Sequence, residues 1–380
     1  MEFGLQKEGL SKEEVMSLLN WARKRDLPYS RILSSMCTDP HPIAVEAHVK
    51  FIEANLGDAG LFPGTKCIEC KVVRMLGSIL GNPNAVGYIT TGGTESNIQG
   101  IRAARNMAKR KHPNIVVSES GHFSFDKIAD ILQVEVRKAS LDENFMIDLG
   151  SVKDLVDENT AAIVGIAGTT EFGQIDPIEG LSNIAQKEGI FLHIDAAFGG
   201  FVIPFLEKEY KFGFEVDGVT SISVDPHKMG MSTIPAGGLL FREKRFLRGL
   251  SISTPYLSTK AQYSLTGTRS GGAAVATYAV LMHLGYDGLK KSALRCVNMA
   301  KMLVDRVEDF GVYPIVDPIM NVLALDVPKI EKVLLMLLVR GWRVSVTRKP
   351  RALRLVIMPH TTEENLNIFI EDLKEIVKNC

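Results

Sequence analysis

One lysine in this 380-residue sequence has the surroundings of a reactive amine. Lys228 lies in "SISVDPHKMG", where an apolar, strand-like run breaks at Asp225-Pro226 and His227 directly precedes the lysine. Burial disfavours the charged form of a lysine and lowers its pKa, and the neutral amine can then attack an aldehyde. The segment therefore indicates a covalent site, with an exposed loop lysine as the alternative.

Two further motifs could bind opposite ends of one small ligand. "TTGGTESN" places Gly93 and Thr94 at the start of a helix, where free N–H groups and the helix dipole attract a phosphate. Its spacing matches neither a dinucleotide-binding nor a Walker A motif, so it indicates a single phosphate monoester. Asp195 in "HIDAAFGG" ends a strand-like run, and its charge could keep a ring nitrogen protonated. Ordinary helix capping would explain either motif by itself.

Together, a phosphate site, a carboxylate for a ring nitrogen and an aldehyde-reactive lysine describe pyridoxal 5'-phosphate (PLP). His122 in "SGHFSFDK" is then the candidate for the side chain that stacks on the pyridine ring and can donate a proton. A lone histidine is more often structural, so this assignment depends on the other three motifs.

The elements that must position these residues are those of an α/β fold with a mostly parallel sheet. Apolar strand-like segments alternate with helical ones from Ala85 to Phe241, which is typical of a sheet covered on both faces. Ligands bind at the carboxyl ends of the strands in such folds. Five unusual polar motifs follow predicted strands, namely "TTGGTESN", "SGHFSF", "GTTEFG", "DAAFGG" and "DPHKMG".

The flanking segments predict three parts. Residues 1–45 form an N-terminal segment, with a helix capped by Ser11 and Glu14. Residues 46–270 form the ligand-binding large domain. One helix is predicted near 43–56, at the start of this domain, and a second near 66–80. Residues 271–380 contain a long helix and a small α+β domain.

Composition excludes several other classes. Lys plus Arg and Asp plus Glu both number 44, so the net charge is zero and nucleic acid binding is not expected. Five cysteines suit a reducing cytoplasm, and "CIEC" falls in a helical pattern without partners for a metal, so we expect no metal site. Neither a signal peptide nor a membrane span is predicted, which indicates a soluble, cytoplasmic protein.

Nine segments resemble, in order, the signature blocks of the group II PLP-dependent amino acid decarboxylases, and most closely those of the archaeal L-tyrosine/L-aspartate decarboxylases. The resemblance runs from about Gly9 to the C-terminus, and the blocks are "NLGDAGLFPGTKCIE", "TTGGTESN", "HFSF", "GIAGTTEFGQID", "HIDAAFGGFVIPF", "DPHKMG", "IPAGGLLF", "TGTRSGG" and "LRLVIMPHTTEE". It implies fold type I and a homodimer with its active sites at the interface.

The resemblance also implies a role for each matching residue. Lys228 would carry PLP as a Schiff base, Asp195 would bind the pyridine nitrogen, and His122 would stack on the ring. The cofactor's phosphate and ring would be contacted by the remaining binding residues, which are Gly93, Thr94, Thr169, Ala197, Asp225 and His227.

Residues on the substrate side follow from the same resemblance. Tyr256 would donate a proton from a mobile loop, with Tyr263 as a second candidate. Arg354 would bind the substrate carboxylate through its guanidinium fork, with Arg269 as a competitor, and Thr266 would be a further substrate-binding residue. A surface arginine on a small-domain strand is the alternative for Arg354.

The reaction implied is decarboxylation of an L-amino acid. Tyrosine would yield tyramine for methanofuran, and aspartate would yield β-alanine for coenzyme A. Both Arg354 and apolar residues such as Phe123 and Phe172 are available, and we favour tyrosine with some aspartate activity. The alternatives are a PLP-dependent carbon–carbon lyase of the sphingosine-phosphate-lyase type, a desulfurase, and a non-catalytic binding protein that keeps the fold.

Overall fold

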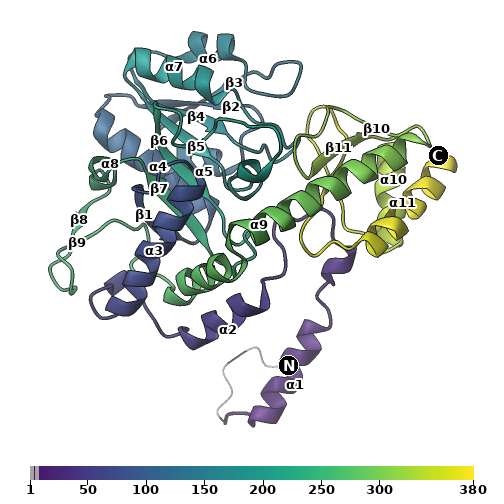
Figure 1. The fold of residues 1–380 in the computed structure, drawn as a ribbon, viewed down its shortest axis with the longest axis horizontal. Coiled ribbons are helices and arrows are strands. Elements are labelled where there is room, and N and C mark those ends of the chain that lie inside the picture. The colour runs from purple at the N-terminus through teal and green to yellow at the C-terminus, as the bar shows by residue number, and fades with distance from the viewer. Residues whose placement is uncertain (1–3, 5–7) are drawn as a thin grey trace.

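A computed structural model of the protein describes residue 4 and residues 8–380 (Figure 1). Helix α1 (Lys12–Arg23) begins with the predicted capping box, in which Ser11 Oγ accepts the N–H of Glu14 at 3.2 Å. None of its residues is buried, and the helix projects away from the rest of the molecule. The short 3-10 turn η1 (Tyr29–Arg31) leads from it towards the domains.

The large domain is built on a seven-stranded sheet with the order β1-β7-β6-β5-β4-β2-β3. The strands are β1 (Val86–Thr90), β2 (Asn114–Ser118), β3 (Glu135–Ala139), β4 (Thr160–Ile166), β5 (Phe191–Asp195), β6 (Val219–Val224) and β7 (Gly237–Phe241). All neighbours from β3 to β6 are parallel, which confirms the mostly parallel sheet.

Strand β7 runs antiparallel to both of its neighbours, β1 and β6. Residues 225–236, which join β6 to β7, contain no helix that could carry the chain back across the sheet, so the chain reverses. Sequence reasoning also did not identify β3, because its "EVRKA" segment is polar and lies at the sheet edge.

Helices cover both faces of this sheet. On one face α4 (Gly93–Ala108) and α5 (Ser124–Leu132) pack on β2 and β4. On the other lie α3 (Pro63–Ile79), α6 (Leu149–Leu155) and α7 (Ile178–Glu188). The alternation of strand side chains explains this, since Ile115 and Val117 join one core and Val116 joins the other. A short helix, α8 (Lys244–Arg248), packs beside β1 and β7.

The long helix α9 (Gly271–Glu308), interrupted at Gly285 where φ is 61°, leads into the small domain. There an antiparallel sheet has the order β10-β11-β13-β12 and is covered by α10 and α11. The bounds are β10 (Tyr313–Pro314), β11 (Val322–Asp326), α10 (Ile330–Val339), β12 (Ser345–Val346), β13 (Leu353–Val356) and α11 (Glu363–Lys378).

The helix expected near 43–56 is shorter than predicted. Helix α2 (Pro42–Lys50) ends early because the following backbone pairs with the segment before α9. Leu56 N–H donates to Arg269 O at 2.9 Å, and Gly271 N–H donates to Ala54 O at 2.7 Å. This pairing continues into the 3-10 turn η2 (Leu56–Asp58).

Within the described chain, no helix is both long and apolar enough to cross a membrane. Cys67 and Cys70 lie on α3, as the helical pattern predicts. Among the described residues, no three His, Cys, Asp or Glu side chains are grouped so as to hold a metal ion.

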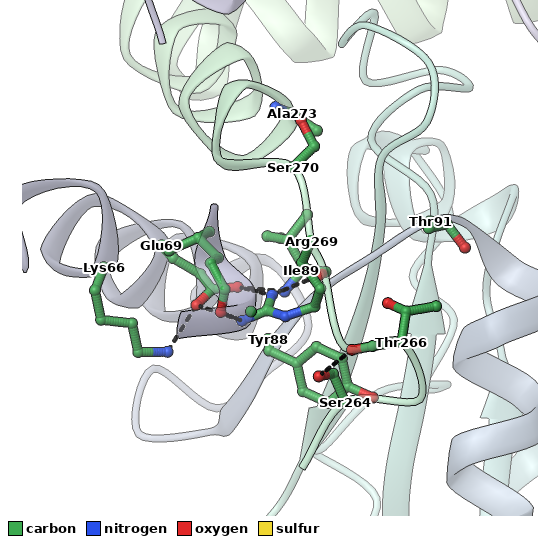
Figure 2. Close-up of polar contacts among 12 residues, drawn as sticks. Lys66, Glu69, Tyr88, Ile89, Thr91, Ser264, Thr266, Arg269, Ser270 and Ala273 are labelled. Carbon is green, nitrogen blue, oxygen red and sulfur yellow. Dashed lines mark hydrogen bonds and ion pairs between the residues drawn. The ribbon is translucent and has the colours of Figure 1, made fainter. Parts of the chain in front are cut away.

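A buried ion pair closes the free edge of β1 (Figure 2). Glu69 of α3 accepts the N–H of Ile89 at 3.1 Å, and Arg269 donates to the carbonyl of Ile89 at 3.0 Å. Arg269 Nη1 lies 2.5 Å from Glu69 Oε1, and Lys66 Nζ lies 2.6 Å from Oε2. Side chains thus satisfy the backbone groups of Ile89 that a missing neighbour strand would have bonded.

The charge of Glu69 depends on these partners. Burial alone would raise the pKa of Glu69, but the positive charges and hydrogen bonds of Arg269 and Lys66 outweigh it and lower the pKa. Removing the carboxylate would leave Arg269 buried and uncompensated.

We expect Glu69→Gln to lower the free energy of unfolding by about 3–5 kcal/mol at neutral pH, measured by chemical denaturation. The control is Glu188→Gln. Glu188 forms an exposed ion pair with Lys187, so its loss should lower the free energy of unfolding by only about 0–1 kcal/mol. Because the folded pKa of Glu69 is lowered, its contribution is present above the usual glutamate pKa and is lost in acid. The difference between wild type and Glu69→Gln should therefore shrink as the pH falls. Equal stability of the two glutamine variants at neutral pH would contradict the structural role.

Candidate active site

A cavity of about 330 Å³ lies at the carboxyl ends of the parallel strands. It collects residues from the turns after β1, β2, β4, β5 and β6, which are far apart in the sequence. Eight of the residues predicted from sequence line it, namely Gly93, Thr94, His122, Asp195, Ala197, Asp225, His227 and Lys228. The fold thus brings the phosphate, ring and lysine motifs into one site.

Lys228 lies in the reversal between β6 and β7. Its Nζ lies 3.2 Å from Oδ2 of Asp225, and its side chain is 18% exposed. The loop is held by a hydrogen bond from Lys228 N–H to the carbonyl of Asp225, at 3.0 Å. His227 Nδ1 donates to the carbonyl of Ala236 at 2.6 Å, which leaves Nε2 on the side of Asp225, 3.9 Å from Oδ2. The amine is therefore partly shielded from water and held beside a carboxylate.

The glycine motif leaves an open, uncapped helix start. Helix α4 begins after Gly92, whose φ of 144° suits glycine, and no side chain caps its first turn. A Cβ on Gly93 would lie 3.0 Å from Asp225 Oδ2 and 3.1 Å from the Cβ of Ala197. Because glycine has no side chain, space is left at the N-terminus of this 16-residue helix, where the helix dipole and the free N–H groups stabilise an anion.

The carboxylate of Asp195 is buried and held by three donors. Asn97 Nδ2 donates to Oδ2 at 2.8 Å. The N–H of Ala197 and the hydroxyl of Ser223 donate to Oδ1 at 3.1 Å and 3.2 Å. Sequence reasoning missed Asn97 and Ser223. The signal for Asn97 was a polar residue one turn after Gly93, on the helix face that meets the sheet.

His122 lines the same cavity from the turn between β2 and α5. Its Nδ1 accepts the N–H of Ser124 at 3.2 Å, and its ring lies 4.0 Å from that of Phe123. Burial lowers the pKa of His122, although the charge of Asp195 opposes this. A neutral imidazole thus faces the cavity.

Thr169, which is expected to contact the cofactor ring, lies in the turn after β4. The Oγ1 of Thr169 is turned away to accept the N–H of Gln174 at 3.0 Å, which closes the turn after β4. Thr170 lines the cavity instead. Thr169 itself is not among the residues that line the cavity, and its contact with the ring stays a prediction.

Arg354 on β13 lies behind this wall of the cavity. Its Nε donates to the carbonyl of Thr170 at 2.5 Å, and its Nη1 donates to the carbonyl of Ser34 at 3.1 Å and to the hydroxyl of Ser345 at 3.0 Å. Its Nη2 is buried and has no hydrogen-bond partner among the residues that the structure describes. Burial lowers the pKa of Arg354 to about 10. The guanidinium thus keeps one free donor beside the site.

The other predicted substrate-side residues do not line the cavity of this chain. Tyr256 is 87% exposed on the hairpin of β8 (Ile252–Ser253) and β9 (Ala261–Gln262), which stands out from the large domain (Figure 1). Tyr263 packs beside Tyr88 in a separate apolar cluster.

The last two, Thr266 and Arg269, lie on the segment that leads to α9 (Figure 2). Thr266 is exposed, and its carbonyl accepts the hydroxyl of Ser264 at 2.9 Å. Arg269 forms a buried ion pair with Glu69 instead of facing the cavity, which does not agree with the expectation that it binds substrate. Its charge stabilises β1 and thereby the glycine motif that follows.

The donor and acceptor set of the cavity fits PLP. The amine of Lys228 could bond to the aldehyde of PLP, and the fixed carboxylate of Asp195 could bind its protonated ring nitrogen. The uncapped start of α4 could bind its phosphate. Asp225 Oδ1 is buried and finds no hydrogen-bond partner in the described part of the chain, which also indicates that this end of the cavity accommodates a polar group.

Comparisons with known proteins agree with this fit. Residues 29–323 match the model of the pyridoxal-dependent decarboxylase conserved domain. A probable L-tyrosine/L-aspartate decarboxylase of Methanothrix thermoacetophila is 58% identical over 370 residues, which are 97% of each chain. A probable L-aspartate decarboxylase of Archaeoglobus fulgidus is 51% identical, over 96% of this chain and 100% of that protein.

Among solved structures, the sphingosine-1-phosphate lyase of Burkholderia pseudomallei superposes with a TM-score of 0.92 at 28% identity, over 99% of this chain and 94% of that one. The fold is thus shared with a sphingosine-1-phosphate lyase, but the sequence identity to the probable decarboxylases is much higher. The chain belongs to the pyridoxal-dependent decarboxylase family and is a PLP-dependent amino acid decarboxylase of fold type I.

Proposed function

We propose that this decarboxylase converts L-tyrosine to tyramine and, more slowly, L-aspartate to β-alanine. The names of the similar proteins support these two substrates. The observation that favours tyrosine is the lining of the cavity. Lys228 is the only lysine or arginine among the described residues that line it, while Met36, Phe123 and Phe198 give it an apolar part. A second substrate carboxylate therefore has no dedicated cation there, whereas an aromatic ring has apolar surface to contact.

The products would serve different pathways, tyramine leading to methanofuran and β-alanine to coenzyme A. Bound PLP supplies the electron sink that makes loss of CO2 possible. The residues of the chain bind and orient the reactants. Lys228 anchors the cofactor, Asp195 keeps a proton on its ring nitrogen, and His122 covers one face of the ring.

We place the substrate carboxylate near Nη2 of Arg354, because this donor is buried and unpartnered beside Thr170. Since Nε and Nη1 are fixed by three hydrogen bonds, the guanidinium could bind a carboxylate without losing further rotational freedom.

We also propose a homodimer in which Tyr256 reaches the site of the other subunit and protonates Cα. The hairpin that carries Tyr256 stands away from the cavity of its own chain (Figure 1). Helix α1 supports an interface as well, because it buries nothing within one chain and exposes Leu18, Leu19 and Trp21 by more than half.

Product analysis tests the substrate. Purified protein with added PLP should release CO2 from L-tyrosine and form tyramine, with slower formation of β-alanine from L-aspartate. Lys228→Ala is the matched control and should release none, because the covalent anchor is lost. Faster turnover of aspartate would overturn the preference for tyrosine.

Arg354→Met should raise KM for the amino acid by about tenfold or more, because a hydrogen bond between charged groups contributes about 1.5–3 kcal/mol. Arg351→Met is the control, since its pair with Glu331 is exposed on the same domain. An unchanged KM in a folded Arg354→Met protein would remove Arg354 from the carboxylate site.

Hybrid dimers test the role of Tyr256. Each of the variants Lys228→Ala and Tyr256→Phe should be inactive as a homodimer. A hybrid carrying one chain of each, purified by two different tags, should recover about half of the wild-type activity per dimer, because one of its two sites is then complete. An inactive hybrid would place Tyr256 in the site of its own chain, and an active Tyr256→Phe homodimer would exclude it as the donor.

A further inference from the structure

The buried face of β5 carries a second polar residue that neither the sequence motifs nor the mechanism above uses. His193 lies two residues before Asp195, so both side chains point to the same face of the sheet, beneath α4. His193 is 1% exposed. A polar ring that is fully buried beside a functional carboxylate requires hydrogen-bond partners, and it has two.

These partners connect His193 to Asp195 through α4. His193 Nε2 lies 3.0 Å from Oδ1 of Asn97, and the amide nitrogen of Asn97 lies 2.8 Å from Oδ2 of Asp195. On the other side of the ring, Nδ1 lies 2.8 Å from the hydroxyl of Ser221, its register partner on β6. The result is a continuous chain from Ser221 through His193 and Asn97 to Asp195.

The direction of every bond in this chain is determined by its last member. A carboxylate only accepts, so Asn97 must turn its NH2 group towards Asp195 and its oxygen towards His193. The second hydrogen of that NH2 group is used by Ser124 Oγ at 3.2 Å. His193 must therefore carry its proton on Nε2, and its Nδ1 accepts from Ser221.

A neutral ring is the form that satisfies this pattern, because it has one donor and one acceptor. Burial lowers the pKa of His193 to about 4, although the charge of Asp195 acts in the opposite direction. The ring is thus neutral at physiological pH.

An independent feature of α4 supports the arrangement. Gly100 lies one turn after Asn97, and a Cβ at this position would come within 2.7 Å of both Cε1 and Nδ1 of His193. Glycine inside a helix costs about 1 kcal/mol relative to alanine. Its presence at this position makes room for the imidazole ring against the helix backbone.

We propose that His193 is a positioning residue of the decarboxylase, which acts through Asn97 to fix the carboxylate of Asp195 against the cofactor's ring nitrogen. The chain of donors restrains the orientation of the Asn97 amide, and that amide in turn holds Oδ2 of Asp195. The inference rests on the proposed role of Asp195, so the experiment tests both residues separately.

His193→Phe removes both hydrogen bonds of the ring while keeping a planar, buried side chain. His193→Gln is the matched control, because its amide can still donate to Asn97 from the position of Nε2. We expect His193→Phe to keep the borohydride-reducible link to Lys228 and to lower kcat about 10- to 100-fold with little change in KM, an effect of the size found for hydrogen-bond partners behind metal ligands. His193→Gln should recover most of this loss.

The visible absorption of the bound cofactor gives a second readout, because it responds to the protonation of the ring and its surroundings. Its pH dependence should shift in His193→Phe, in the same direction as in Asp195→Asn, and should return towards wild type in His193→Gln. If His193→Phe does not fold, Asn97→Ala breaks the chain from α4 and should give the same fall in kcat and the same spectral shift.

Three results would overturn the proposal. Wild-type kcat and spectrum in folded His193→Phe would show that Asp195 does not depend on the chain. Equal impairment of the Phe and Gln variants would assign His193 to packing alone. Full activity of Asp195→Asn would remove the role of Asp195 itself, and with it any positioning role for His193.

Discussion

The buried carboxylate of Asp195 is the constraint on which the arrangement of the large domain depends. A charge at the end of β5 costs several kcal/mol unless donors surround it, and three donors do so here. They come from three places, the side chain of α4, the backbone after β5 and the hydroxyl of β6. The packing of α4 on the sheet and the register of β5 with β6 must therefore both be correct before the carboxylate is satisfied.

The same helix serves the opposite end of the site. The uncapped first turn of α4 faces the proposed position of the cofactor's phosphate, and one turn later Asn97 donates to Asp195. A small shift of α4 would therefore disturb both contacts at once. Its position is supported from outside the site, because the buried pair of Glu69 and Arg269 holds β1, which leads into the glycine motif.

Two parts of the chain extend beyond this framework. Helix α1 buries none of its residues, and the β8–β9 hairpin carries an exposed tyrosine away from the cavity (Figure 1). Both features fit the proposed dimer, in which apolar surface would be covered and the active site completed by a second copy. Arg354 belongs to the small domain, whereas almost all residues that line the cavity belong to the large domain. The small domain thus places a guanidinium next to this cavity.

The sequence by itself determined the strand and helix alternation of the large domain and the cofactor, and it supplied the residues proposed for the cofactor site, Lys228, Asp195 and the glycine motif. These follow from local patterns, since apolar runs, helix starts and strand ends are properties of short segments. Only the tertiary structure decided which neighbouring side chains complete the site. Asn97 and His193 contact each other only because α4 packs on the face of β5. Arg269 pairs with Glu69, which lies 200 positions away in the sequence. Thr170 and not Thr169 lines the cavity, and the hydroxyl of Thr169 accepts the N–H of Gln174 in the turn after β4. Such outcomes depend on packing between distant segments, which no local pattern records.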